Sequence, residues 1–364
     1  MFVAWRDLRF AKGRFALMGT VIVLITVLVG LLSGLTAGLG RENTSAVTSL
    51  PTDHLVFSAP AQGEDVSFTD SRLSAETTER WAKVRGVDRA EPLGIATTKA
   101  EAGPRNAALS AFGVRPGSGL APEARRITDG AAVLSEKAAD ELGVRAGDHF
   151  TLAGQRLRVA AVSGEAMYSH TPVVWTSLDD WQQMGGGPAA VRGTGGSTVL
   201  ALTTEGAGAG ALAAADKKLG TKTVSSADAL QAIGSFTAEN GSLQLMRGFL
   251  FAISALVIGA FFTVWTIQRS GDVAVLKALG ASTRYLLKDA LGQAVVLLVL
   301  GTGLGTALAA GVGTAVGGTV PFVLEPATVL VPALIMIALG AVGAALSIRR
   351  ITSVDPLTAL GSAR

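Results

Sequence analysis

Cysteine is absent from this chain of 364 residues, and only 16% of its residues are charged. The missing thiols exclude disulfides, cysteine-ligated iron–sulfur clusters and a cysteine nucleophile, but they do not identify the compartment. Aromatic residues are also sparse, at 5% of the sequence. Because a typical soluble domain carries about a quarter charged residues, this composition favours a protein that is partly embedded in a membrane.

Several binding motifs are also missing. The sequence has no Gly-Lys dipeptide and therefore no G-x-x-x-x-G-K-[ST] phosphate loop, so we do not expect the chain to hydrolyse ATP by itself. No basic block is interleaved with aromatics, which argues against nucleic acid as a partner. No His or carboxylate pair has the spacing of a metal site, so we expect no structural metal and no intrinsic cofactor. A nucleophile triad is not recognisable either.

Four apolar stretches are each long enough to cross a bilayer, which takes about 20 residues in a helix. The first stretch is too long for a signal-peptide core and lacks a clean cleavage site, so we expect it to be retained. The third and fourth stretches meet at a Gly-rich segment near Pro321, where we expect a turn. The predicted spans are residues 15–39, 244–268, 290–314 and 329–348, with a turn at 315–328.

Basic residues are concentrated in three short segments, 1–14, 269–289 and 349–364. Together these segments carry 11 Lys and Arg against 4 Asp and Glu, whereas the rest of the chain carries 20 against 24. The positive-inside rule therefore predicts a multi-pass protein of the plasma membrane with both termini in the cytoplasm. Residues 40–240 and the turn at 315–328 are then expected to face outward.

The long segment 40–240 has the patterns of a folded domain. Ser74 and Ser135 are candidate helix N-caps, and Gly143 is a candidate helix end. Residues 144–162 alternate apolar and polar side chains around Ala153-Gly154, which is typical of a β-hairpin. The other expected elements are helices at 74–85, 136–142, 207–219 and 225–240 and strands at 107–114, 131–134, 172–177 and 198–203.

The predicted fold class is thus a membrane protein with four transmembrane α-helices and an α+β extracellular domain inserted between spans 1 and 2. We expect the inserted domain to contain a small mixed sheet.

Four motifs give the chain a family resemblance. Met1–Arg14 is similar to an amphipathic elbow helix on the cytoplasmic face, and Val133–Asp148 to an extracellular-domain motif. Gln268–Ser282 is similar to a cytoplasmic motif and Asp355–Leu360 to a C-terminal tail motif. Over its full length the chain resembles the FtsX-like or MacB-type permeases of ABC transporters. Within that family, Tyr168–Trp175 and the compact size are most similar to haem-efflux members.

The resemblance implies a non-catalytic permease subunit that forms a homodimer in the lipid bilayer. It implies two copies of a separate ABC ATPase, which bind the ATP and drive the permease mechanically. Family members are described as moving substrate from the outer leaflet rather than through a central pore.

The loop 269–289 is the expected ATPase dock. Its apolar positions follow helical spacing up to Gly280, and a short helix held between two spans suits docking in a partner's groove. The alternative is an interfacial helix that rests on lipid. The coupling residues predicted here are Val273, Val275, Leu276, Lys277 and Leu279.

Haem is the substrate that this resemblance implies, and a haem site needs apolar walls, a cation for the propionates and axial donors such as His, Met or Tyr. Arg247 lies at the expected outer end of the second span, where an ionisable residue indicates function. Snorkelling of Arg247 to the headgroups explains it equally well. The candidate contacts around it are Asn240, Gln244 and Met246, with Leu31, Ser33 and Leu35 on the first span; ordinary helix packing also accounts for those three.

A second group of candidates is expected on a loop between two strands. Glu165, Tyr168 and His170 are placed where binding residues are often displayed. Hydrogen bonding within the domain is the alternative role, and it is favoured for His170.

Three other functions stay open. The chain could export a peptide antibiotic or a lipid, or its outer domain could regulate a cell-wall hydrolase by mechanotransmission without transport. A membrane enzyme is disfavoured because the sequence offers no catalytic constellation.

Overall fold

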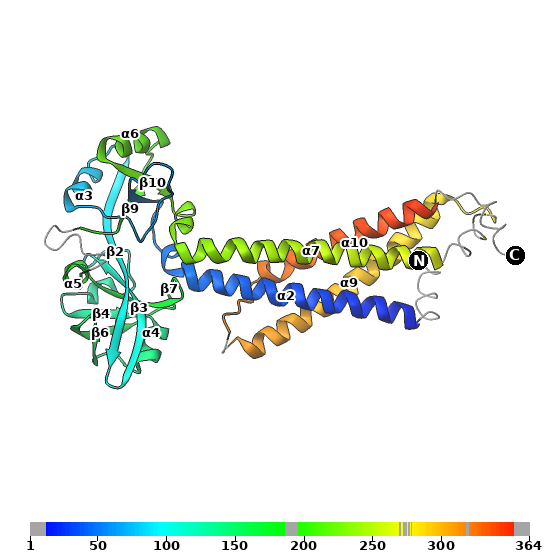
Figure 1. The fold of residues 1–364 in the computed structure, drawn as a ribbon, viewed down its shortest axis with the longest axis horizontal. Helices are drawn as coiled ribbons and strands as arrows, with labels where there is room; N and C mark the ends of the chain where they lie inside the picture. The colour runs from blue at the N-terminus through cyan, green and yellow to red at the C-terminus, as the bar shows by residue number, and fades with distance from the viewer. Residues whose placement is uncertain are drawn as a thin grey trace. The chain divides into compact units, whose positions relative to one another are not determined.

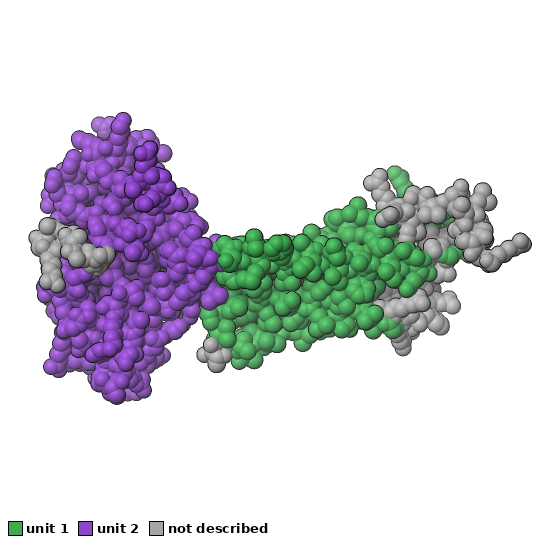
Figure 2. All heavy atoms as spheres, viewed as in Figure 1, with its two compact units in different colours: residues 1–38, 241–364 green, residues 39–240 purple. Residues whose placement is uncertain are grey.

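The protein is described from a computed structural model, which covers residues 12–185, 196–268, 271, 275, 277, 279–317 and 320–352. The chain divides into two compact units, residues 1–38 with 241–364 and residues 39–240 (Figure 2). Residues 1–11 of the expected elbow helix and residues 353–364 of the expected tail lie outside the described part.

The first unit is built from long apolar helices. In the described residues these are α2 (Lys12–Thr48), α7 (Gly234–Gln268), α9 (Thr283–Val316) and α10 (Pro326–Thr352). By length and composition, each of these helices is long and apolar enough to cross a membrane. Helices α2 and α7 run on beyond their apolar stretches, and their ends belong to the second unit.

Small residues bring the helices of the first unit close together. A Cβ on Gly30 of α2 would lie 2.8 Å from the Ala309 Cβ on α9, and one on Gly305 would lie 2.7 Å from the Thr26 Cβ. Between α7 and α10, Thr263 and Ser347 share a hydrogen bond of 2.9 Å between their hydroxyls. Close backbone approach and interhelical hydrogen bonds are how helices associate in lipid, where apolar burial gives little driving force. Gly301 and Gly305 of α9 therefore serve close packing against α2.

The second unit is an α+β domain around a mixed sheet. In the described residues the sheet has ten strands in the order β10-β1-β9-β2-β3-β8-β4-β6-β5, with β7 paired to β8 and β5 also paired to β2. The pairs β3–β8 and β4–β6 are parallel and the others are antiparallel. The strands are β1 (His54–Ser58), β2 (Val87–Ala102), β3 (Arg105–Val114), β4 (Ala131–Leu134), β5 (His149–Leu152), β6 (Gln155–Val162), β7 (Met167–Tyr168), β8 (Thr171–Ser177), β9 (Val199–Thr204) and β10 (Thr221–Ser225).

The long strand β2 passes through both halves of this domain (Figure 1). Its first part pairs with β9 and its second part with β3, so it divides the domain into two lobes. Helices α3 and α6 lie in the lobe with β9 and β10, and α4 and α5 in the other (Figure 1). The helical segments are α3 (Ala75–Trp81), η1 (Ala124–Arg126), α4 (Glu136–Leu142), α5 (Leu178–Gln183), α6 (Ala209–Leu219) and η2 (Asp228–Ala232).

Local signals in the sequence predict several elements correctly. Ser74 and Ser135 cap α3 and α4 by accepting hydrogen bonds from backbone N–H groups, and Gly143 ends α4 in the left-handed conformation. The β5–β6 hairpin turns at Ala153 and Gly154, which both have positive φ. The expectation of a small sheet is wrong, since the described residues form a sheet of ten strands. Strands β1, β2, β7 and β10 were not expected, because their sequences show no clear alternation of apolar and polar residues. The helix expected over 225–240 is instead β10's last residue, η2 and the start of α7.

Candidate functional site

The candidate substrate residues of the second span lie on one helix, α7. Asn240, Gln244 and Arg247 are spaced by four and three residues, so they share one face of the helix. Met246 is 49% exposed and precedes a row of exposed apolar side chains that includes Phe249 and Ile253. Among the described residues, the guanidinium of Arg247 has no recorded hydrogen bond or ion pair. A cation therefore lies beside exposed apolar side chains, and no carboxylate of the described residues forms an ion pair with it.

The candidates on α2 are more enclosed. Ser33 is buried, and its hydroxyl has no hydrogen-bond partner in the described chain. Leu31 and Leu35 are half-buried. Neighbouring Gly34 accepts a hydrogen bond of 3.1 Å from the Val323 N–H and faces the ring of Phe322, in the connection between α9 and α10. Within the described part of the chain, none of these side chains has a recorded contact with Arg247.

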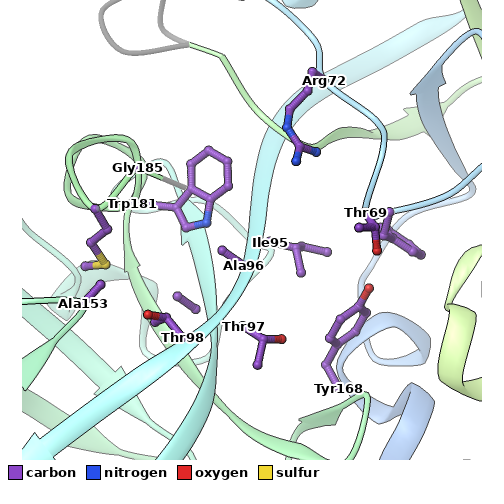
Figure 3. Close-up of a pocket in the computed structure, with 13 residues that line it drawn as sticks. Thr69, Arg72, Ile95, Ala96, Thr97, Thr98, Ala153, Tyr168, Trp181 and Gly185 are labelled. Carbon is purple, nitrogen blue, oxygen red and sulfur yellow. The ribbon is translucent and has the colours of Figure 1, made fainter. Parts of the chain in front are cut away.

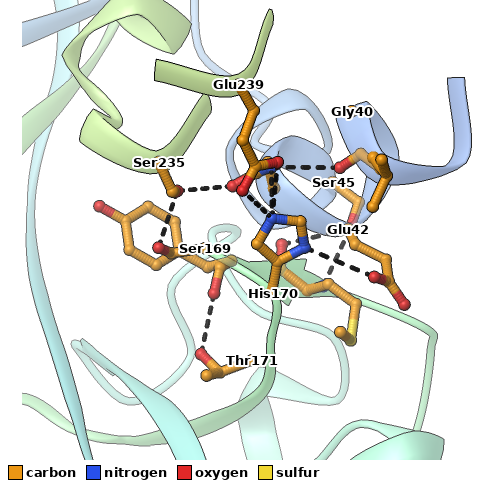
Figure 4. Close-up of polar contacts among 12 residues, drawn as sticks. Gly40, Glu42, Ser45, Ser169, His170, Thr171, Ser235 and Glu239 are labelled. Carbon is orange, nitrogen blue, oxygen red and sulfur yellow. Dashed lines mark hydrogen bonds and ion pairs between the residues drawn. The ribbon is translucent and has the colours of Figure 1, made fainter. Parts of the chain in front are cut away.

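A polar cluster surrounds His170, in the turn between β7 and β8. Its Nε2 atom lies 2.9 Å from both carboxylate oxygens of Glu239 on α7, and its Nδ1 atom lies 3.5 Å from Glu42 on α2 (Figure 4). Asn43 donates to Glu239 at 3.1 Å and accepts from the Ser235 hydroxyl at 2.5 Å. We call these five residues the His170 cluster. All of them belong to the second unit.

The backbone around His170 is strained. Ser169 and His170 both have positive φ, at 49° and 62°, in a two-residue turn where Asn-Gly is the usual choice. The N–H groups of Ser169 and His170 donate to the carbonyls of Asn43 and Glu42 on α2. Such conformations persist when the surrounding contacts over-determine them, and they concentrate at functional positions. The turn is therefore held against the end of α2 by both backbone and side chains.

Charged neighbours extend the cluster at its edge. Lys137 on α4 donates to Glu42 at 2.8 Å, and Arg41 pairs with Glu165 at 3.4 Å. Because the Glu165 carboxylate is engaged by Arg41 and largely exposed, its recorded role is a surface ion pair, which contributes about 0–1 kcal/mol.

Tyr168 does not lie on an exposed loop, so that expectation is wrong. It forms part of strand β7, is 7% exposed, and makes edge contacts with the rings of Phe68 and Phe112. Burial raises the pKa of its phenol far above the ordinary value, so the group stays protonated. The three candidates of this segment therefore differ in environment. Tyr168 lies in the hydrophobic core of the domain, whereas Glu165 and His170 form polar contacts with α2 and α7.

The expected coupling segment is described in part. Val273 and Leu276 lie outside the described residues, whereas Val275 and Leu279 are 55% and 79% exposed. The Gly280 N–H donates to the Lys277 carbonyl, and Gly280 ends the segment with φ +93°. Ser282 then caps α9 by accepting from the Tyr285 N–H. Two exposed apolar side chains thus precede the turn at Gly280 and the capped start of α9.

Sequence reasoning missed the partners of His170, namely Glu42, Asn43 and Glu239. The available signal was that polar and acidic side chains follow one apolar stretch and precede another, at the ends of two long helices. Their convergence on one histidine depends on contacts across 127 and 69 residues, which periodicity does not report.

Family models match both units. The MacB-like periplasmic core domain matches residues 15–219, more than half of the chain. The FtsX-like permease C-terminal domain matches residues 245–356.

Relatives match the chain from end to end. The chain is 25% identical, over 99% of both chains, to a Staphylococcus haemolyticus protein named as hemin transport system permease protein HrtB. It is 26% identical, again over 99% of both, to an uncharacterized ABC transporter permease of Mycobacterium bovis.

Two solved structures are similar to part of the chain. The extracellular domain of the ABC-type transporter YknZ from Gram-positive bacteria has a TM-score of 0.36 and 17% identity, covering 48% of this chain and 98% of its own. The periplasmic region of MacB from Actinobacillus actinomycetemcomitans has a TM-score of 0.36 and 12% identity, covering 53% and 97%. From the family match over both units, this chain belongs to the FtsX-like, MacB-type permeases of ABC transporters.

Proposed function

We propose that this permease exports haem, or a similar amphipathic anion, from the outer leaflet of the plasma membrane. Its termini lie in the cytoplasm, and residues 40–240 lie outside. Two copies of the chain work with two copies of a separate ABC ATPase. The basic residues at the two ends and in 269–289 support this orientation, and the hemin transport name of a full-length relative supports the substrate.

The observation that carries the proposal is the unneutralised Arg247 beside the exposed Met246. Haem combines a flat apolar plate with two propionate carboxylates and an iron that accepts Met, His or Tyr as axial ligand. Arg247 suits a propionate because a guanidinium forms paired, charge-assisted hydrogen bonds with carboxylates. Gln244 and Asn240, on the same face of α7, add neutral amide groups, and exposed Met246 supplies a thioether. Ser33, Leu31 and Leu35 are proposed as the opposing wall on α2.

The ATPase acts through the segment that contains Val275 and Leu279. Exposed apolar side chains on a short helix suit insertion into a groove of a partner. Val273, Leu276 and Lys277 are proposed to belong to the same docking segment. Because α9 begins directly after it at a capped residue, a displacement of the docked segment passes straight into a membrane helix.

Haem titration of the purified full-length protein tests the substrate. We expect a saturable change in the haem absorption band with the parent protein. Arg247→Ala should weaken binding by about tenfold, since a charge-assisted hydrogen bond contributes about 1.5–3 kcal/mol. Arg284→Ala, which removes an exposed arginine from the start of α9, is the matched control and should bind as the parent does. Equal affinities for all three proteins would refute the proposed site.

A second candidate function is mechanotransmission to an external hydrolase without transport. The His170 cluster favours it, because it ties the domain ends of α2 and α7 to one strained turn. Under this reading the parent protein shows no saturable haem binding, whereas disruption of the His170 cluster changes the activity of the external partner.

A further inference from the structure

A separate cavity opens in the domain formed by residues 39–240. It has a volume of about 440 Å³, within the range of about 300–1,000 Å³ that is common for ligand pockets. Strands β2 and β3, helix α5 and the segment between β1 and α3 line it (Figure 3). It lies wholly in the second unit, whereas Arg247 belongs to the first.

Three side chains with hydrogen-bond donors line this cavity, those of Arg72, Tyr168 and Trp181. Figure 3 shows the guanidinium of Arg72 and the hydroxyl of Tyr168 pointing into the same space, with Trp181 across from them. In the described chain Arg72 donates only to the carbonyl of adjacent Ser71, and no hydrogen bond of the Tyr168 hydroxyl is recorded. The Trp181 indole nitrogen is buried, and it too has no partner there. Leaving a buried donor such as this indole N–H unsatisfied costs about 1–3 kcal/mol, so the cavity suits a ligand that brings acceptor groups.

The charge of the lining is one-sided. Its described residues include Arg72 but no Asp or Glu. Partial burial lowers the pKa of Arg72, and the nearby charge of Asp70 offsets only part of that effect. A guanidinium stays protonated in proteins, so the cavity holds a cation that is partly removed from water and has no ion pair within the described residues.

Apolar side chains and three threonines form the remaining walls, and the indole of Trp181 is the largest flat group among them. Trp181 lies against Gly94 and Gly113, where an added Cβ atom would come within 2.4 Å of the indole Cδ2 and within 2.5 Å of the Trp181 Cβ, respectively. These two glycines hold the indole flat against the sheet. Ile95, Ala96 and Met184 supply further apolar surface, and a thioether adapts readily to aromatic ligands.

We propose that this cavity binds a small aromatic carboxylate. The carboxylate pairs with Arg72 and accepts a hydrogen bond from the Tyr168 hydroxyl, while the ring lies beside Trp181, Ile95 and Met184. This site is distinct from the transport site, and the inference does not depend on the identity of the exported substrate.

Equilibrium dialysis with the full-length protein in lipid nanodiscs tests the proposal, with 2-naphthoate as the probe and empty nanodiscs as background. The parent protein should bind one 2-naphthoate saturably. The neutral isostere 2-naphthamide should bind about tenfold more weakly, because it loses the charge-assisted pair. Absence of saturable 2-naphthoate binding, or equal binding of the amide, would overturn the proposal.

Two variants locate the probe. Arg72→Gln should weaken 2-naphthoate binding by about tenfold or more. Tyr168→Phe keeps the ring contacts with Phe68 and Phe112 and should weaken binding by a smaller factor, about threefold, as one neutral hydrogen bond is lost. Arg145→Gln, at an exposed position away from the cavity, is the control and should bind as the parent does. If Arg72→Gln and Arg145→Gln bind equally well while both show the parent's unfolding midpoint, the assignment to this cavity is wrong.

Discussion

Asp180 is a buried carboxylate at the start of a helix, where it accepts a hydrogen bond from the backbone. It lies in the first turn of α5, which Ser177 caps, and its Oδ2 accepts a hydrogen bond of 2.9 Å from the Gly130 N–H. Burial raises the pKa of Asp180 above its usual value, and this effect outweighs the opposing hydrogen bonds from Gly130 and Ser177. The folded state therefore binds this proton more tightly than the unfolded chain does.

A raised pKa makes stability fall as the pH rises from the usual Asp value through the higher folded value. Asp180→Asn keeps an acceptor oxygen for Gly130 and removes the titration. We expect the variant to lose less stability than the parent between pH 4 and pH 7, when thermal unfolding of the full-length protein is followed in detergent. A variant whose unfolding midpoint falls as steeply as that of the parent would show that Asp180 contributes nothing to the pH dependence.

At the residue scale, the sequence predicts those structural roles that depend on residues close by in the chain. Ser135 caps α4 by accepting from the Ala138 N–H, three residues ahead, so the sequence identifies it directly. The burial of Tyr168 depends on Phe68 and Phe112, which are distant in sequence. The hydropathy of its own segment does not distinguish a core tyrosine from a displayed one. The same limit hid the cavity donors Arg72 and Trp181.

At the scale of elements, helices α2 and α9 pack closely because small residues lie at their contact. A Cβ on Gly305 would lie 2.8 Å from the Val23 carbonyl oxygen, whereas one on Gly303 would meet nothing within 4 Å. Gly305→Leu should therefore push the helices apart and destabilise the protein by about 1–3 kcal/mol, the usual range for overpacking. The measurement is the thermal unfolding midpoint in one detergent.

Gly303→Leu is the matched control, since it adds the same side chain two residues away on an open face. It should leave the midpoint close to that of the parent. Equal midpoints for the two variants would contradict the close α2–α9 packing.

The His170 turn is the second element with a testable role. His170→Asn retains a residue that tolerates positive φ but removes the imidazole that contacts Glu42 and Glu239. We expect faster amide hydrogen exchange at residues 167–171 and 234–240, because both segments lose a shared side-chain contact. His149→Asn, at an exposed position in β5, makes the same replacement elsewhere and should not change exchange in these segments. Unchanged exchange in the His170 variant would mean that the backbone contacts alone hold the turn.

Elements with strong local signals were predictable, whereas the sheet as a whole was not. Strand β4 and helix α4 match the expected 131–134 and 136–142 because the caps and the apolar run coincide. Strand β2 contains Pro92 and Gly94, which weaken a strand signal, and it is held by β9, β3 and β5 from elsewhere in the chain. The two lobes of the domain are joined through β2. Because the periodicity of the sequence does not predict this strand, it does not predict the two lobes either.

At the scale of the whole molecule, the proposed orientation can be read with single cysteines, because the chain has none of its own. Ala61→Cys lies at an exposed position of the domain and Gly271→Cys at an exposed position after α7. In intact cells a membrane-impermeant maleimide should label Ala61→Cys at once and Gly271→Cys only after permeabilisation. The reverse pattern would invert the topology.

Hydropathy and charge alone predict the spans and the orientation, whereas the proposed substrate depends on Arg247, which has no ion-pair partner among the described residues. The most direct test of the account uses proteoliposomes that contain the permease together with its proposed ABC ATPase subunit. Haem is loaded into the membrane, and the haem that stays membrane-bound is measured by absorption with and without ATP. The account predicts that ATP accelerates haem loss from these membranes, and that the acceleration is smaller with Arg247→Ala. Haem loss at the same rate with and without ATP would contradict it.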